Sequence, residues 1–69
     1  MAAPLITAVD PITGACLTRR TERTYFAAVV IDTAQGAVAV AWCGRPDLAD
    51  KRLRDISSRH ASARLALVA

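Results

Sequence analysis

Two apolar stretches on either side of a short turn are the feature that most restricts how this chain can fold. Residues 25–31 and 37–43 are rich in β-branched, aromatic and small apolar side chains, a composition typical of strands. Residues 32–36 between them have the composition of a turn and end in a glycine. The pattern predicts an antiparallel hairpin without a polar face. In a sheet with one face in water, each strand alternates apolar with polar residues. These two strands do not alternate in this way, so both faces of the hairpin need cover.

The apolar pattern also predicts the register of the hairpin. A loop at residues 33–36 places Asp32 opposite Ala37 and Val29 opposite Val40, and a slip by one residue would mix the two faces. In this register one face carries Tyr25, Val29, Ile31, Val38, Val40 and Trp42. The opposite face carries Phe26, Ala28, Val30, Ala37, Ala39, Ala41 and Cys43.

The remaining segments predict three more strands and a helix. Residues 5–9 and 15–19 flank a turn that contains Pro11 and Gly14, and residues 63–68 alternate weakly. A helix is expected to begin at Pro46, since proline suits the first helical position, and one side of it carries Leu48, Ala49, Leu53, Ile56 and His60. We therefore expect one α+β domain over residues 1–69, with the order ββββαβ. Its small antiparallel sheet has three to five strands and one helix packed on one face. Whether residues 63–68 join this sheet or a neighbour's stays open.

The composition predicts a thin core. Of the 37 hydrophobic residues in this chain of 69, 15 are alanines, and each alanine buries only one methyl group. Domains of this size usually gain stability from disulfides, a metal or a partner subunit. The two cysteines form no disulfide framework and no signal peptide precedes them, so we expect reduced thiols and a cytoplasmic protein. Self-association is the expected supplement to the core.

Protein binding is the first functional hypothesis. One helix covers one face of a small sheet, which leaves the second hairpin face for another copy of the chain or for a different protein. The expected interface consists of Phe26, Val30, Ala39, Ala41 and Trp42. This hypothesis describes a non-catalytic binding or assembly module that forms a homo-oligomer.

Nucleic-acid binding is the alternative. Arginines alternate with threonine hydroxyls between residues 18 and 24, and the formal net charge is +3. Guanidinium and hydroxyl groups hydrogen-bond phosphate oxygens. The alternative site consists of Arg19, Arg20 and Arg23, joined by Arg45 and Arg54. The same arginines could instead be solvated side chains that protect a strand edge from aggregation.

No residue set predicts catalysis, a metal or a cofactor. Asp47 and Asp50 are one helical turn apart, but the start of a helix explains them as partners of its dipole. Cys16, Cys43 and His60 lack the close pairing of a zinc site. No apolar run is long enough to cross a bilayer, so no membrane partner is expected.

Two stretches have a recognisable style of sequence: Thr-Arg-Arg-Thr-Glu-Arg-Thr-Tyr at residues 18–25 and Trp-Cys-Gly-Arg-Pro-Asp-Leu-Ala at residues 42–49, together 16 of 69 residues. They resemble sequences in small uncharacterised proteins of actinobacteriophages and their hosts. The resemblance implies an accessory protein that acts in a bacterial cytoplasm. It implies no catalytic residue and no known activity, and it favours the binding of a host or phage protein.

Overall fold

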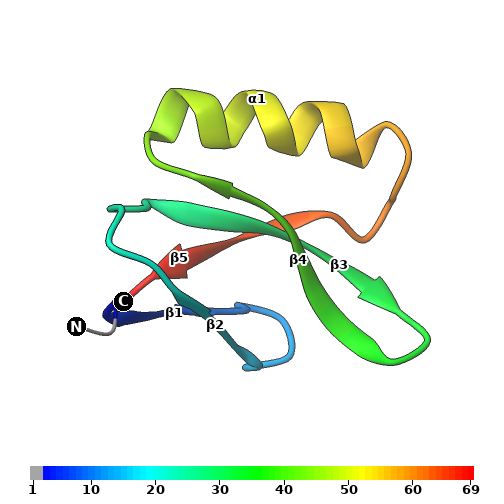
Figure 1. The fold of residues 1–69 in the computed structure, drawn as a ribbon. Coiled ribbons are helices and arrows are strands. Elements are labelled where there is room, and N and C mark those ends of the chain that lie inside the picture. The colour runs from blue at the N-terminus through cyan, green and yellow to red at the C-terminus, as the bar shows by residue number, and fades with distance from the viewer. Residues whose placement is uncertain (1–2) are drawn as a thin grey trace.

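The computed structural model describes residues 3–69, which form five strands and one helix in the order ββββαβ (Figure 1). The elements are β1 (Leu5–Val9), β2 (Cys16–Arg20), β3 (Ala27–Thr33), β4 (Gly36–Cys43), α1 (Pro46–Ser57) and β5 (Arg64–Val68). This confirms the α+β class, the element order and the antiparallel sheet with one helix. The predicted strands agree with the observed ones to within two residues at each end.

The strands form one antiparallel sheet in the order β2-β1-β5-β3-β4. The last strand of the sequence, β5, lies at the centre, where it pairs with β1 of the first hairpin and β3 of the second. Val9 pairs with Leu67, and Ala28 pairs with Ala66. Residues 64–68 therefore complete this sheet and join its two hairpins.

The register predicted for the β3–β4 hairpin is right near the turn and wrong beyond it. From the turn as far as Ala39 the pairing agrees with the prediction. A β-bulge then shifts the register, so that Val29 pairs with Ala41 instead of Val40. Beyond the bulge every side chain of β4 changes face, which turns Trp42 to the face opposite the predicted one.

Because the sheet is curved, its own strands cover its inner face. The sheet curls so strongly that it nearly forms a barrel, with β2 and β4 as its free edges (Figure 1). On the inner face Ala8, Ala28, Val30 and Ala66 are fully buried, and against them pack Leu17, Ala37, Ala39, Trp42 and Val68. The expectation that one hairpin face lacks cover within the chain is therefore wrong, because residues of β1, β2 and β5 cover it.

Helix α1 lies on the outer face of the sheet, across β3, β4 and β5 (Figure 1). Pro46 occupies the first helical position, as the sequence predicts. Buried Ala49 packs against Ala27 and Cys43, and half-buried Leu65 packs against the same cluster. The helix ends at Ser57, so His60 is exposed beyond it instead of extending its apolar side.

The burial of Val29 beneath the helix predicts a sharp response to charge. Val29→Asp is expected to unfold the protein, because Val29 is fully buried and a carboxylate there costs about 3 kcal/mol or more. That is a large part of the stability of a small domain. Val38→Asp is the matched control, since Val38 lies in the same hairpin and is 36% exposed. Far-UV circular dichroism should show strand and helix signals for the control only, and a folded Val29→Asp protein would contradict this packing.

Candidate functional site

The arginines of the 18–24 segment lie at one end of the sheet. Arg19 and Arg20 belong to β2, Arg23 lies in the connection to β3, and all three are exposed. Arg20 pairs with Leu5, so this end is the one at which β1 begins. The arginines therefore project from one end of the molecule and are not spread along the edge of the sheet.

The fold brings the start of α1 to the same end. The backbone N–H of Phe26 donates to the carbonyl oxygen of Cys43 at 2.8 Å. A Cβ atom on Gly44 would lie 3.4 Å from the carbonyl oxygen of Thr24. The residues just before Arg45 thus lie against the segment that carries Arg23, although 22 positions separate the two arginines in the sequence.

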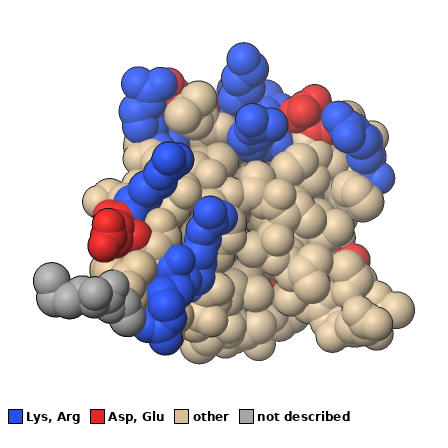
Figure 2. All heavy atoms as spheres, viewed as in Figure 1, with Lys and Arg blue, Asp and Glu red and all other residues tan. Residues whose placement is uncertain are grey.

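Positive charge dominates one view of the surface. Figure 2 shows Lys and Arg side chains gathered over α1 and down the side where β2 runs into β3, with few acidic groups between them. Arg45 Nε lies 3.5 Å from Asp47 Oδ1, but both side chains are about 70% exposed, and such a surface pair is weak. Arg45 therefore remains free to bind an anion. We call Arg19, Arg20, Arg23 and Arg45 the basic end.

Two aromatic side chains pack next to the basic end. Arg19 Cζ lies 5.2 Å from the centroid of the Tyr25 ring, a cation–π contact. The Tyr25 and Trp42 rings meet edge to face, with 6.0 Å between centroids and 62° between planes. Because both rings are half-buried and contact each other, they hold Arg19 in place and offer little free surface.

The other residues named from the sequence do not gather into one site. Arg54 lies in the last turn of α1, nine residues from Arg45, which corresponds to about 13 Å along a helix. Of the expected protein interface, Val30 is fully buried in the inner core and Phe26 is 38% exposed. Ala39 and Trp42 pack on the inner face, whereas Ala41 pairs with Val29 and belongs to the outer face. Three of the five, Val30, Ala39 and Trp42, pack together in the inner core, and Val30 is inaccessible to any partner in this fold.

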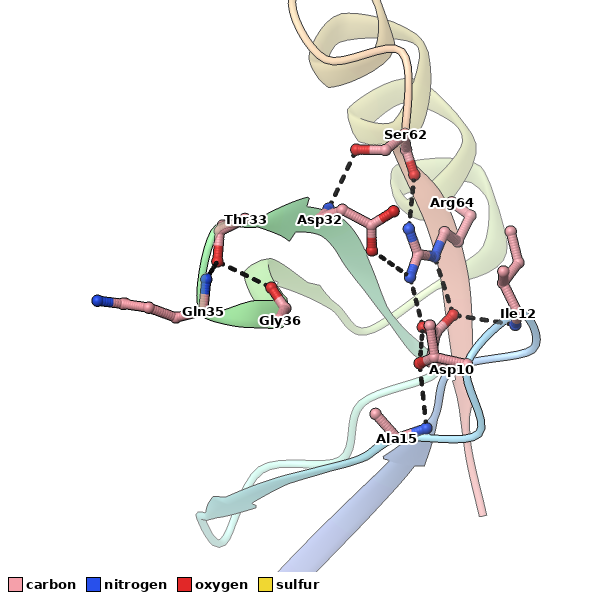
Figure 3. Close-up of polar contacts among 10 residues, drawn as sticks. Asp10, Ile12, Ala15, Asp32, Thr33, Gln35, Gly36, Ser62 and Arg64 are labelled. Carbon is pink, nitrogen blue, oxygen red and sulfur yellow. Dashed lines mark hydrogen bonds and ion pairs between the residues drawn. The ribbon is translucent and has the colours of Figure 1, made fainter.

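An ion cluster around buried Asp10 and Arg64, which the sequence analysis missed, lies at the opposite end of the sheet (Figure 3). Arg64, at the start of β5, donates from Nε to Asp10 Oδ1 at 2.9 Å and from Nη2 to Asp10 Oδ2. The same Nη2 lies 2.9 Å from Asp32 Oδ1, and Nη1 donates to the carbonyl of Ser62 at 3.0 Å. Thr13 Oγ1 donates to Asp10 Oδ2 at 2.5 Å. We call Asp10, Asp32 and Arg64 the ion cluster.

The electrostatics of the ion cluster indicate a structural role. Hydrogen bonds from Arg64, and further ones from Thr13 and the backbone of Ile12, hold the pKa of Asp10 well below its ordinary value. Hydrogen bonds to Asp10 and Asp32 raise the pKa of Arg64 above its ordinary value. Asp10 accepts four hydrogen bonds from within the chain, two at each carboxylate oxygen, so its lone pairs are all used. This carboxylate has no capacity left for a metal or for proton transfer.

The thiols and other metal-binding side chains are dispersed. Within residues 3–69 no group of three His, Cys, Asp or Glu side chains is arranged to hold a metal ion. Cys16 is exposed on β2, whereas Cys43 is buried under α1. Burial raises the pKa of the Cys43 thiol. His60 is exposed and contributes to no cluster.

Comparison of the sequence and the fold with known proteins identifies no relative. No family model matches the chain, and no curated protein or solved structure is significantly similar to it. Among the described residues, α1 is too short and too polar to cross a bilayer, and it is the only helix there.

The ion cluster predicts an acid-sensitive stability. Since the pKa of Asp10 is lowered in the folded state, its contribution is complete above its ordinary pKa of about 3.8 and is lost as the pH falls below that value. Asp10→Asn is expected to lower the melting temperature at neutral pH by roughly 10 °C or more, since it leaves Arg64 with a weaker partner. The difference from the unmodified protein should shrink below pH 4. Asp50→Asn, on the exposed side of α1, is the control. Equal melting temperatures for Asp10→Asn and the unmodified protein at pH 7 would contradict the role assigned to the cluster.

Proposed function

We propose that this protein is a non-catalytic module that binds nucleic acid through its basic end. The observation that supports this most directly is the side-by-side position of the Arg19–Arg23 segment and Arg45. Four exposed guanidinium groups from two distant parts of the sequence thus project from one end of the molecule. Guanidinium groups bind phosphate oxygens with two parallel hydrogen bonds, which suits a phosphodiester backbone.

The overall charge also supports this proposal. The formal net charge is +3, and the buried pair of Asp10 and Arg64 is neutral, so the remaining charged groups, which include the exposed Asp32, carry the whole of it.

The arrangement favours recognition of phosphates over recognition of bases. Tyr25 and Trp42 are half-buried, and Arg19 lies over the Tyr25 ring, so neither ring offers a free face for base stacking. The start of α1 adds backbone N–H groups without intrahelical partners, since the first helical bond runs from Ala49 N to the Arg45 carbonyl. We expect binding that is strongly salt-dependent and tolerant of sequence.

Fluorescence anisotropy with a labelled single-stranded oligonucleotide over a salt series tests the proposal. Arg20→Ala, Arg23→Ala and Arg45→Ala are each expected to weaken binding. Each should also reduce the slope of log K against log salt by about 0.7 for a single strand, because each removes one phosphate contact. The matched control is Arg59→Ala, since Arg59 is equally exposed, lies beyond the far end of α1 and pairs with Asp55 at 3.7 Å.

Two results would overturn the proposal. One is the absence of binding by the unmodified protein at low salt, where phosphate contacts are strongest. The other is an equal loss of affinity in Arg59→Ala and in the three variants of the basic end, which would indicate a general effect of net charge.

A second candidate, binding of a protein partner, is supported by the free edge of β4. This strand contains no charged residue over its eight positions, whereas the other edge strand, β2, carries Arg19 and Arg20. A long uncharged edge is suited to pairing with an added strand, and Ala39, Ala41 and Trp42 of the expected interface all lie on it.

Nuclease-treated pull-downs from bacterial lysate separate this candidate from nucleic-acid binding. A partner that pairs with β4 is expected to be lost with Val40→Lys, because Val40 is the exposed bulge residue, and retained with Arg23→Ala. If every captured protein disappears after nuclease treatment, the second candidate fails and the basic end accounts for the binding.

A further inference from the structure

The basic residues of α1 differ in the charges that surround them. On a helix, side chains four positions apart are neighbours, so an acidic neighbour offsets a basic one. Lys51 lies four positions from both Asp47 and Asp55. Arg54 lies four positions from Asp50. The charge of these two basic residues is therefore partly offset by acids on the surface of the helix itself.

Arg52 has different neighbours. The side chains four positions before and after it are Leu48 and Ile56, which carry no charge. Asp55 lies three positions beyond Arg52, but its carboxylate pairs with Arg59 at 3.7 Å. Arg52 is exposed, and among residues 3–69 no carboxylate lies within ion-pair distance of it. Its positive charge is therefore available to an anion from outside the chain.

Cys43, at the end of β4, connects Arg52 with the basic end. Burial raises the pKa of the Cys43 thiol, and the positive charge of Arg52 opposes this rise, so the guanidinium lies near this end of β4. The carbonyl oxygen of Cys43 accepts a hydrogen bond from the backbone N–H of Phe26, at the end of the connection that carries Arg23. Arg45 follows Cys43 by two residues. Arg52 therefore lies on the part of α1 that adjoins the basic end.

The spacing of the arginines along α1 suits a phosphodiester backbone. Arg52 follows Arg45 by seven residues, close to two full turns, so the two lie on the same side of the helix and about 10 Å apart along it. Successive phosphates of one strand are about 3.4 Å apart along the axis of a duplex, and farther apart in an extended strand, so the interval corresponds to roughly two or three nucleotides. Leu48 lies between the two arginines and is 40% exposed, which offers an apolar surface to a sugar ring.

We propose that a bound nucleic-acid strand leaves the basic end past Arg45 and continues along α1 as far as Arg52. This inference rests on the proposed function, because it extends the same site. The ligand is then one continuous strand longer than the basic end, and a short oligonucleotide fills only part of the site. The path ends at Arg52, since the next arginine on this side, Arg59, already pairs with Asp55.

Fluorescence anisotropy with two labelled oligothymidylates, of about four and about twelve nucleotides, tests this path over a salt series. Arg52→Ala is expected to weaken binding of the longer strand roughly threefold or more at low salt. It should also reduce the slope of log K against log salt by about 0.7, because one phosphate contact is lost. Binding of the shorter strand should not change, since the basic end takes up its few phosphates.

Arg54→Ala is the matched control. It removes the same charge from the same helix, but two residues correspond to more than half a turn, so Arg54 points to a different side of α1 from Arg52. Its salt slope should equal that of the unmodified protein for both strands. Arg52→Lys keeps the positive charge and should restore the slope, which a merely structural role of the guanidinium would not predict. Far-UV circular dichroism checks that all three variants are folded.

The outcomes separate this inference from the proposed function. If the variants of the basic end bind both strands more weakly while Arg52→Ala behaves like the unmodified protein, the inference is wrong and the proposed function stands. An equal effect of Arg52→Ala and Arg54→Ala also overturns the inference, because it indicates a general effect of net charge. If the unmodified protein binds neither strand at low salt, the inference and the proposed function both fail.

Discussion

The contact between Arg64 and Asp10 is the interaction on which the joining of the two hairpins depends. A buried guanidinium is costly unless its N–H groups find acceptors, and Arg64 finds them only where β1, β3 and β5 come together. Asp10 follows the last residue of β1, Asp32 lies near the end of β3, and Arg64 begins β5. The ion cluster therefore holds the ends of three strands at one point. Since β5 lies between β1 and β3 in the sheet, Arg64 reaches a carboxylate on each side.

The two ends of the inner core are closed by different chemistry. At one end the ion cluster seals the core with hydrogen bonds among charged groups. At the other end Arg19, Tyr25 and Trp42 seal it with a cation–π contact and an edge-to-face ring pair. Between them the core consists mainly of alanine and valine, which gives close contact between strands but little apolar area. Closing both ends with larger polar and aromatic groups compensates for the small side chains in the middle.

Local pattern was sufficient to predict the elements but not their full pairing. The strands, the helix start at Pro46 and the register near the β3–β4 turn follow from composition within short windows. The bulge at Val40 left no signal, because both faces of β4 are apolar and either register satisfies the hydrophobic pattern. The central position of β5 was also beyond reach, since its pairing partners lie more than 30 residues away in the sequence.

The candidate sites show the same difference between what a local sequence pattern reveals and what only tertiary contacts reveal. Arg19, Arg20 and Arg23 are visible as a local cluster, whereas the approach of Arg45 depends on tertiary contacts between residues 24–26 and 43–44. Neither Asp10 nor Arg64 stands out in the sequence as a site residue. One signal could have revealed the pair: Arg64 alternates with Ala66 and Val68 on the inward side of an apolar strand, so its charge required a buried partner.

The position of β5 has a consequence for how the chain reaches this fold. The strand that follows β1 to β4 in the sequence is the central strand of the sheet, and it carries the arginine that contacts its neighbours. Until residues 64–68 are available, the two hairpins have no strand to join them, and Asp10 has no guanidinium partner. The cooperative transition therefore requires residues 64–68, and it closes a 54-residue separation between Asp10 and Arg64, which is costly in chain entropy.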